Sequence, residues 1–176
     1  YQRREPIYKG MGDIICCLDE SDSTKGDLAA WGKAVALTLL EIASDGGRKF
    51  ALVHFSGGTR CETDIFCPGE YGAADKMRAA ETFLGGGTNF QTPMAMAVQL
   101  MRERGFENAD IVFITDGACA MTEDYLAQLR EAQLALGFTV TGVLLDRGGP
   151  GMDFSLRPFC QNIYRTSELT AEDIVR

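Results

Sequence analysis

The sequence lacks most of the marks that identify common classes of enzyme. It has one histidine, His54, and no G-x-S-x-G motif, which argues against a Ser-His-Asp hydrolase. It has no G-K-[ST] phosphate-binding loop, and its Gly10-x-Gly12 pair precedes a predicted strand, the wrong context for a dinucleotide fingerprint. None of its six cysteines forms a C-x-x-C pair, which argues against a zinc site.

Two kinds of segment are also missing. No apolar run approaches the about 20 residues that a membrane helix needs, so we expect no membrane span. Lysine and arginine do not cluster beyond Arg3-Arg4, and the net charge of −8 argues against a nucleic-acid partner and an anionic membrane surface. No signal peptide is visible and the chain begins with Tyr1. We interpret it as a fragment of a longer cytoplasmic protein, with its cysteines reduced and buried.

What is present is the composition of an ordinary globular domain. The chain has 176 residues, 45% of them hydrophobic and 24% charged. That length suits one domain with a core of its own. Residues 1–9 are polar and mixed, and we interpret them as an arm or linker. Residues 10–176 then form a single domain.

Short apolar runs alternate with segments of helical period. The predicted strands are Asp13–Leu18, Lys49–Ser56, Thr59–Phe66, Asp110–Thr115, Thr139–Leu145 and Asn162–Thr166. The predicted helices are Leu28–Ala43, Ala73–Leu84, Pro93–Arg104, a helix capped by Thr122 that runs through Leu136, a short Ser155–Cys160 and Thr170–Val175. This order predicts an α/β fold: a doubly wound, mainly parallel six-stranded sheet with helices on both faces. The tight Gly57-Gly58 turn makes one edge strand antiparallel.

Five oxygen-bearing side chains stand out against this fold. Asp19, Ser21 and Ser23 form D-x-S-x-S after the first strand, Thr88 follows Gly85-Gly86-Gly87, and Asp116 follows the strand Asp110–Thr115. Ligands of doubly wound sheets bind beyond the carboxyl ends of strands, where the strand order reverses. We therefore expect the five to share one crevice. An all-oxygen set suits Mg²⁺, Mn²⁺ or Ca²⁺.

In this order the motifs resemble the metal-ion-dependent adhesion site (MIDAS) of von Willebrand factor A (vWA) domains. The resemblance covers Asp13 to about Thr166, and it departs at Asp22 and Thr24, where the family often has Gly and Met. It implies a binding module and no catalysis: the five side chains hold Mg²⁺ or Mn²⁺, and a partner protein's acidic side chain completes the shell. The chain is most similar to the bacterial intracellular ViaA-like or CoxE-like group, which implies a MoxR-type AAA+ ATPase as partner.

Other interpretations stay open from the residues alone. One is a Mg²⁺-dependent phosphatase with Asp19 as nucleophile, although Ser21 stands where its second aspartate belongs. Another is a structural domain with a non-functional site. Ser21 and Ser23 could instead cap a helix, and the glycine run could merely stop one. Three further residues are expected to have no part in the site: His54 is a packed or partly exposed strand residue, Trp31 belongs to the core, and Glu20 is a solvated surface charge.

Overall fold

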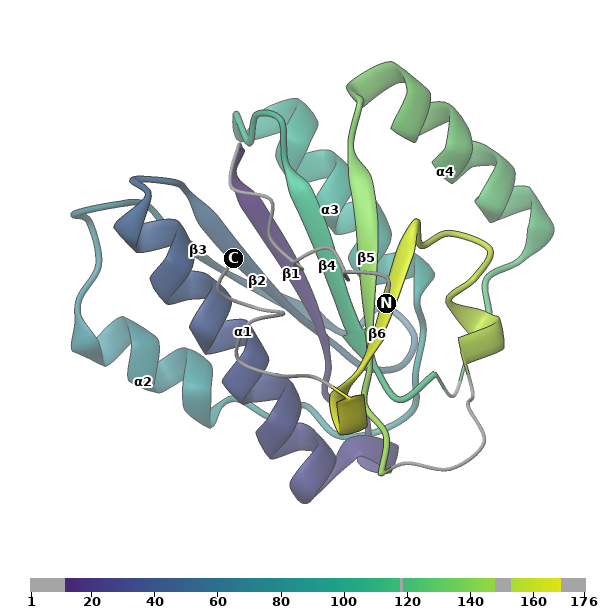
Figure 1. Ribbon diagram of the computed structural model, residues 1–176, viewed down its shortest axis with the longest axis horizontal. Helices are drawn as coiled ribbons and strands as arrows, with labels where there is room; N and C mark the ends of the chain where they lie inside the picture. The colour runs from purple at the N-terminus through teal and green to yellow at the C-terminus, as the bar shows by residue number, and fades with distance from the viewer. Residues whose placement is uncertain (1–11, 118, 148–152, 169–176) are drawn as a thin grey trace, which may run out of the picture.

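The structure is a computed structural model, and it describes residues 12–117, 119–147 and 153–168. Its six strands are β1 (Ile14–Asp19), β2 (Phe50–Phe55), β3 (Cys61–Phe66), β4 (Asp110–Thr115), β5 (Thr139–Leu144) and β6 (Asn162–Arg165). They form one sheet in the order β3-β2-β1-β4-β5-β6 (Figure 1). Every neighbouring pair is parallel except β2 and β3. The predicted fold class is confirmed.

Four α-helices cover the two faces of the sheet. They are α1 (Asp27–Asp45), α2 (Ala73–Glu81), α3 (Gln91–Glu103) and α4 (Glu123–Leu136). Helices α1 and α2 pack on one face, and α3 and α4 on the other (Figure 1). One-turn 3₁₀ helices lie at Asp22–Thr24, Asp153–Ser155 and Thr166–Glu168. The predicted helix Thr170–Val175 and the arm at residues 1–9 lie outside the described residues.

Two helices show how local chemistry sets their ends. The Thr122 hydroxyl accepts the Tyr125 N–H at 3.2 Å, so it caps α4 as expected, and Gly137 ends α4 with a left-handed φ of 70°. Helix α2 ends at Glu81, short of the predicted Leu84. It ends there because Thr82 is extended, with its carbonyl bound by the ammonium of Lys33 at 2.7 Å.

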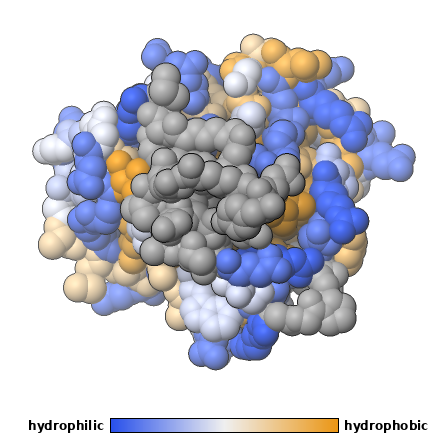
Figure 2. All heavy atoms as spheres, in the orientation of Figure 1, coloured by the Kyte–Doolittle hydropathy of each residue, from blue (hydrophilic) through white to orange (hydrophobic). Residues whose placement is uncertain are grey.

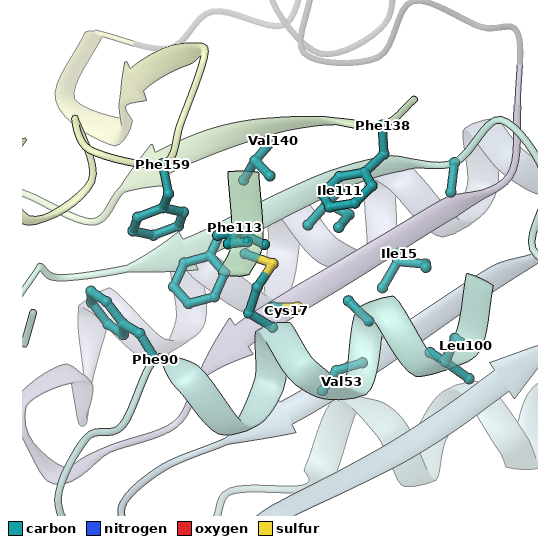
Figure 3. Close-up of a cluster of buried hydrophobic side chains, with 14 of the residues drawn as sticks. Ile15, Cys17, Val53, Phe90, Leu100, Ile111, Phe113, Phe138, Val140 and Phe159 are labelled. Carbon is teal, nitrogen blue, oxygen red and sulfur yellow. The ribbon is translucent and has the colours of Figure 1, made fainter. Parts of the chain in front are cut away.

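The core is two apolar layers, one on each face of the sheet. Neighbouring Cys16 and Cys17 point into opposite layers, as residues on a strand must. Figure 3 shows Cys17 beside Phe113, whose ring in turn packs against those of Phe90 and Phe159. These rings pack edge to face, with the Phe113 centroid 5.0 Å from that of Phe90 and 5.2 Å from that of Phe159. The β1–β4 pair is thereby held rigidly between the layers.

Two predictions about local structure were wrong. Trp31 is 40% exposed, because it lies off the stripe of α1 that faces the sheet. The segment predicted as a helix from Ser155 to Cys160 is a 3₁₀ turn at Asp153–Ser155 followed by further turns. The other exposed large side chains are scattered over several elements, and Figure 2 shows hydrophobic residues only in separate patches on its face.

No helix among the described residues is both long enough and apolar enough to cross a membrane.

Candidate metal site

Asp19 ends β1 in the middle of the sheet, beside β4. Its side chain is fully buried, and both carboxylate oxygens accept hydrogen bonds. Oδ1 accepts the Ser21 N–H at 2.9 Å, and Oδ2 accepts the Thr115 hydroxyl at 2.6 Å. Burial raises the pKa of Asp19, the hydrogen bonds from Ser21 and Thr115 lower it, the charge of Asp116 raises it, and the net shift is upward. The carboxylate is thus held in one orientation, within electrostatic reach of Asp116.

Ser21 and Ser23 present their hydroxyls side by side in the loop after β1. The two hydroxyls are hydrogen-bonded to each other with their Oγ atoms 3.0 Å apart, and Ser21 is buried whereas Ser23 is exposed. The Thr24 hydroxyl donates to the Ser21 carbonyl at 2.8 Å and closes the turn from Ser21 to Thr24. Neither serine side chain caps a helix, since Gly26 stands at the N-cap of α1 and Ser21 makes no capping bond to the 3₁₀ turn. The two hydroxyls therefore do not serve as helix caps.

The loop that carries Thr88 is bonded directly to the serine loop. The Gly85 N–H donates to the Glu20 carbonyl, and the Asp22 N–H donates to the Gly86 carbonyl, both at 2.8 Å. Gly85 and Gly86 have φ angles of 70° and 94°, which side chains would disfavour. Helix α2 has already ended at Glu81, so the glycine run shapes this loop and is not the helix stop.

Asp116 directly follows β4, the strand beside β1, and its charge acts on Asp19. The parallel pairing of Leu18 with Ile114 sets the ends of β1 and β4 side by side. The loop beyond is fixed by Gly117, whose N–H donates to the Thr115 hydroxyl at 3.1 Å and whose carbonyl accepts the Ser155 hydroxyl at 2.9 Å. The Cys119 thiol reaches the Thr88 carbonyl at 3.5 Å, so the Asp116 and Thr88 loops also touch.

The spacing of the serine oxygens fits an octahedral ion. Six-coordinate Mg²⁺ with bonds of about 2.1 Å holds neighbouring ligand oxygens about 3.0 Å apart. Ser21 Oγ and Ser23 Oγ already have that separation, 3.0 Å. Among the described residues no group of three or more His, Cys, Asp or Glu side chains could hold a metal. A cation bound at this edge of the sheet would therefore need hydroxyl ligands such as those of Ser21 and Ser23 in addition to carboxylates.

Two residues beside the site were missed or misjudged from the sequence, whereas His54 is a packed strand residue as expected. Thr115 was assigned only to a strand, yet its hydroxyl orients Asp19. Glu20 was expected to be solvated but is 1% exposed, and His54 lies buried against it. A signal for Glu20 existed: the strand period of two places it on the same face as Cys16 and Leu18, toward the α1 layer.

The comparison with known families settles the class. The family model for the von Willebrand factor type A domain matches residues 14–118. This chain belongs to that family. Members generally serve as protein-interaction modules, and no enzyme activity is indicated for this vWA domain.

Two relatives come from Methanocaldococcus jannaschii. The uncharacterized protein MJ0811 is 37% identical over 129 residues, 73% of this vWA domain's chain and 29% of the relative. The uncharacterized protein MJ0077 is 29% identical over 182 residues, 99% of this chain and 45% of the relative. The chain therefore spans less than half the length of either relative.

Solved structures share the fold at low sequence identity. BatB from Bacteroides thetaiotaomicron has a TM-score of 0.62 at 16% identity, covering 93% of this chain and 94% of its own. A von Willebrand factor type A structure from Catenulispora acidiphila has a TM-score of 0.55 at 19% identity, covering 75% of this chain and 33% of its own. These likenesses show a shared fold over the aligned parts of the chain.

Proposed function

We propose that this vWA domain is a divalent-cation-dependent protein-recognition module. Asp19, Ser21, Ser23, Thr88 and Asp116 are the proposed ligand set for Mg²⁺ or Mn²⁺, with Ca²⁺ less suited to it. The observation that carries the proposal is the serine pair, whose oxygens lie 3.0 Å apart beside the buried, oriented carboxylate of Asp19. Each of the other two side chains lies in a loop tied to this centre.

The roles follow from what each side chain already does. Both oxygens of Asp19 accept hydrogen bonds inside the protein. This suits a carboxylate that orients the serine loop and contacts the metal through water. Ser21 and Ser23 have hydroxyls that suit direct contact. A divalent ion held by neutral hydroxyls supplies unneutralised positive charge, which attracts a carboxylate. A partner protein would donate that acidic side chain.

Of the two acidic residues next to the proposed ligands, Glu20 has its charge balanced inside the protein, whereas Asp22 is exposed. Glu20 is paired with Lys33 and His54 inside the protein, so its charge is balanced there. Asp22 is exposed at the serine loop, and its Oδ1 lies 3.1 Å from where a Cβ on Gly85 would stand. Asp22 is therefore the acidic side chain that would strengthen cation attraction and oppose an acidic ligand.

A more specific assignment rests on the resemblance alone. We infer that the domain is of the ViaA-like or CoxE-like kind and works with a MoxR-type AAA+ ATPase in the cytoplasm, as one domain of a longer protein. The test is a pull-down of the purified ATPase on immobilised domain in Mg²⁺ and in EDTA. Retention in Mg²⁺ only supports the partnership, and equal or absent retention contradicts it.

The phosphatase alternative fits the geometry less well. A nucleophilic carboxylate must present a free oxygen to substrate, whereas both oxygens of Asp19 are buried and accept hydrogen bonds. Ser21 supplies no second carboxylate at the position where D-x-D enzymes have one. Hydrolysis of a generic phosphate ester that is lost in Asp19→Asn would restore this alternative.

Calorimetric titration of Mn²⁺ tests the proposal. We expect saturable heat with the wild-type domain and none with Asp19→Ala or Ser21→Ala. The matched control is Asp124→Ala, which removes an exposed carboxylate from the first turn of α4 and should bind like wild type. Equal heats for all four proteins, or none for wild type, would remove the basis for a metal site. A non-functional site would also leave the melting temperature unchanged when Mn²⁺ is added.

A further inference from the structure

A cluster of four ionisable side chains lies behind the serine loop, with Glu20 and His54 buried and Lys33 and Asp64 partly exposed. At its centre is Glu20, the residue between Asp19 and Ser21. Glu20 Oε2 accepts a hydrogen bond from His54 Nδ1 at 2.6 Å and another from Lys33 Nζ at 2.8 Å. On the far side of the ring, His54 Nε2 lies 2.9 Å from Asp64 Oδ2. The side chains of Glu20 and His54 are 2% and 1% exposed, so their mutual contact is shielded from water, whereas those of Lys33 and Asp64 are 13% and 20% exposed.

The hydrogen-bond partners of His54, the only histidine of the chain, favour one protonation state of its ring. Each ring nitrogen faces a carboxylate, and an ionised carboxylate can only accept hydrogen bonds. Both nitrogens must then donate, which requires the imidazolium. Charge balance agrees, because Lys33 and a charged His54 offset Glu20 and Asp64. Two groups flank the cluster: exposed Arg78, with Nε 3.7 Å from Asp64 Oδ1, and exposed Glu62, opposite His54 on β3.

Lys33 extends the cluster to the other ligand-bearing loop. Its ammonium has three donors, and all three are used: one for Glu20, one for the Ala79 carbonyl at 2.8 Å and one for the Thr82 carbonyl at 2.7 Å. Ala79 and Thr82 form the end of α2, from which the chain passes directly into the Gly85–Thr88 loop.

The backbone of Glu20 makes the same connection. Its N–H donates to the Phe55 carbonyl and its carbonyl accepts the Gly85 N–H, both at 2.8 Å. One residue thus joins the serine loop, the end of β2 and the Thr88 loop. Glu20 Oε1 is buried and has no hydrogen-bond partner among the described residues, so within that part of the chain Lys33 and His54 are the polar partners of the carboxylate. Removing either leaves a buried charge short of a partner.

We propose that Glu20, Lys33 and an imidazolium form of His54 are positioning residues of the metal site. Their charged groups bind one another, Asp64 and carbonyls at the end of α2. They fix the serine loop against the Thr88 loop, so that hydroxyls from two separate segments meet at one ion. This inference rests on the proposed function for its effect on metal binding, while the charged state of His54 stands on the cluster alone.

Nuclear magnetic resonance of the single imidazole tests the cluster without any metal. In the wild-type domain at neutral pH, both ring nitrogens should give the ¹⁵N shifts of protonated nitrogens. In Glu20→Gln, a near-isosteric change that removes one carboxylate charge, the Nδ1 signal should move toward that of an unprotonated nitrogen. The matched control is Glu62→Gln, which removes an exposed carboxylate opposite His54 and should leave both signals in place. A wild-type ring with one unprotonated nitrogen would overturn the proposal.

Calorimetry with Mn²⁺ tests the positioning role on the same proteins. Partners that orient metal ligands typically change affinity by about 10–100-fold, so Glu20→Gln and Lys33→Met should raise the Kd for Mn²⁺ at least about tenfold. Glu62→Gln and Lys76→Met, changes in exposed side chains, should stay within about twofold. Wild-type affinity in Glu20→Gln and in a folded Lys33→Met would overturn the positioning role, with the metal site itself intact. No binding by wild type would instead overturn the proposed function, and the ring signals would still decide the state of His54.

Discussion

The hydroxyl of Thr115 offers the sharpest test of how this edge of the sheet is built. It donates to Asp19 Oδ2 at 2.6 Å and accepts the Gly117 N–H at 3.1 Å, and the side chain is fully buried. Thr115→Val keeps the shape of the side chain and removes both hydrogen bonds. The substitution therefore separates hydrogen bonding from packing at the end of β4.

The expected loss follows from the two bonds. A hydrogen bond to a charged group contributes about 1.5–3 kcal/mol, and a buried N–H left without a partner costs about 1–3 kcal/mol. We expect Thr115→Val to lower the free energy of unfolding by about 3–5 kcal/mol. In a domain of this size each kcal/mol shifts the melting temperature by about 2–4 °C, so the Tm should fall by roughly 10 °C. The Kd for Mn²⁺ should rise by about 10–100-fold, because Asp19 loses its orientation.

The effect should also depend on pH. The Thr115 bond favours the ionised form of Asp19 and lowers its pKa, against the stronger effect of burial. Without that bond the folded-state pKa of Asp19 rises further. The variant therefore loses the most folding free energy at pH values where Asp19 is ionised. The stability gap between wild type and Thr115→Val should therefore narrow as the pH falls through the raised pKa and Asp19 becomes neutral.

Denaturant unfolding and calorimetry measure these quantities, with two reference variants. Thr115→Ser keeps the hydroxyl and should retain most of the affinity for Mn²⁺. Thr141→Val changes a buried threonine of β5 that has no side-chain hydrogen bond to any described residue, and it should be nearly neutral. If Thr115→Val unfolds like Thr141→Val and binds Mn²⁺ like wild type, Asp19 does not depend on this bond and the reasoning is refuted.

Three further changes test other parts of the structure. Gly57→Ala would bring a Cβ to 3.2 Å from the backbone of Gly87, so it should weaken Mn²⁺ binding in calorimetry, whereas Gly72→Ala, where a Cβ meets open space, should not. Phe113→Ala removes the central ring of the aromatic cluster and should lower the unfolding free energy by about 3–5 kcal/mol in denaturant titration. Burial tends to raise the pKa of Asp146, but hydrogen bonds from Ser167 and the charge of Arg165 hold it below its ordinary 3.8. The stability advantage of wild type over Asp146→Asn, about 1 kcal/mol, should thus be complete above pH 3.8 and vanish as the pH falls below it.

Much of the fold was predictable because its signals are local. Each of the six strands is an apolar or alternating run bounded by turn residues, and the tight turn at Gly57-Gly58 gave the antiparallel edge. Thr122 and Gly137 marked the ends of α4 for the same reason. Helix α2 was predicted too long because its true end depends on Lys33, a residue far away in sequence that binds its last carbonyls. No local pattern carries that information.

The candidate site was likewise predictable only in part from the sequence. D-x-S-x-S and the positions of Asp19 and Asp116 at strand ends were visible in the sequence, since strand ends meet at one edge of a parallel sheet. The hydrogen bond from Thr115 was not visible, because it depends on the register that sets β1 against β4. The pairing of Glu20 with His54 was hidden for another reason: a glutamate after a strand is more often solvated than buried.

The central claim is that five side chains from three loops bind one divalent cation, and a crystal of the domain soaked in Mn²⁺ tests it most directly. Anomalous diffraction should show one manganese peak at bonding distance, about 2.0–2.3 Å, from Ser21 Oγ and Ser23 Oγ, with Thr88 and the two aspartates in direct or water-bridged contact. A saturating soak that leaves this edge without a peak, in a lattice that leaves it open to solvent, would contradict the account.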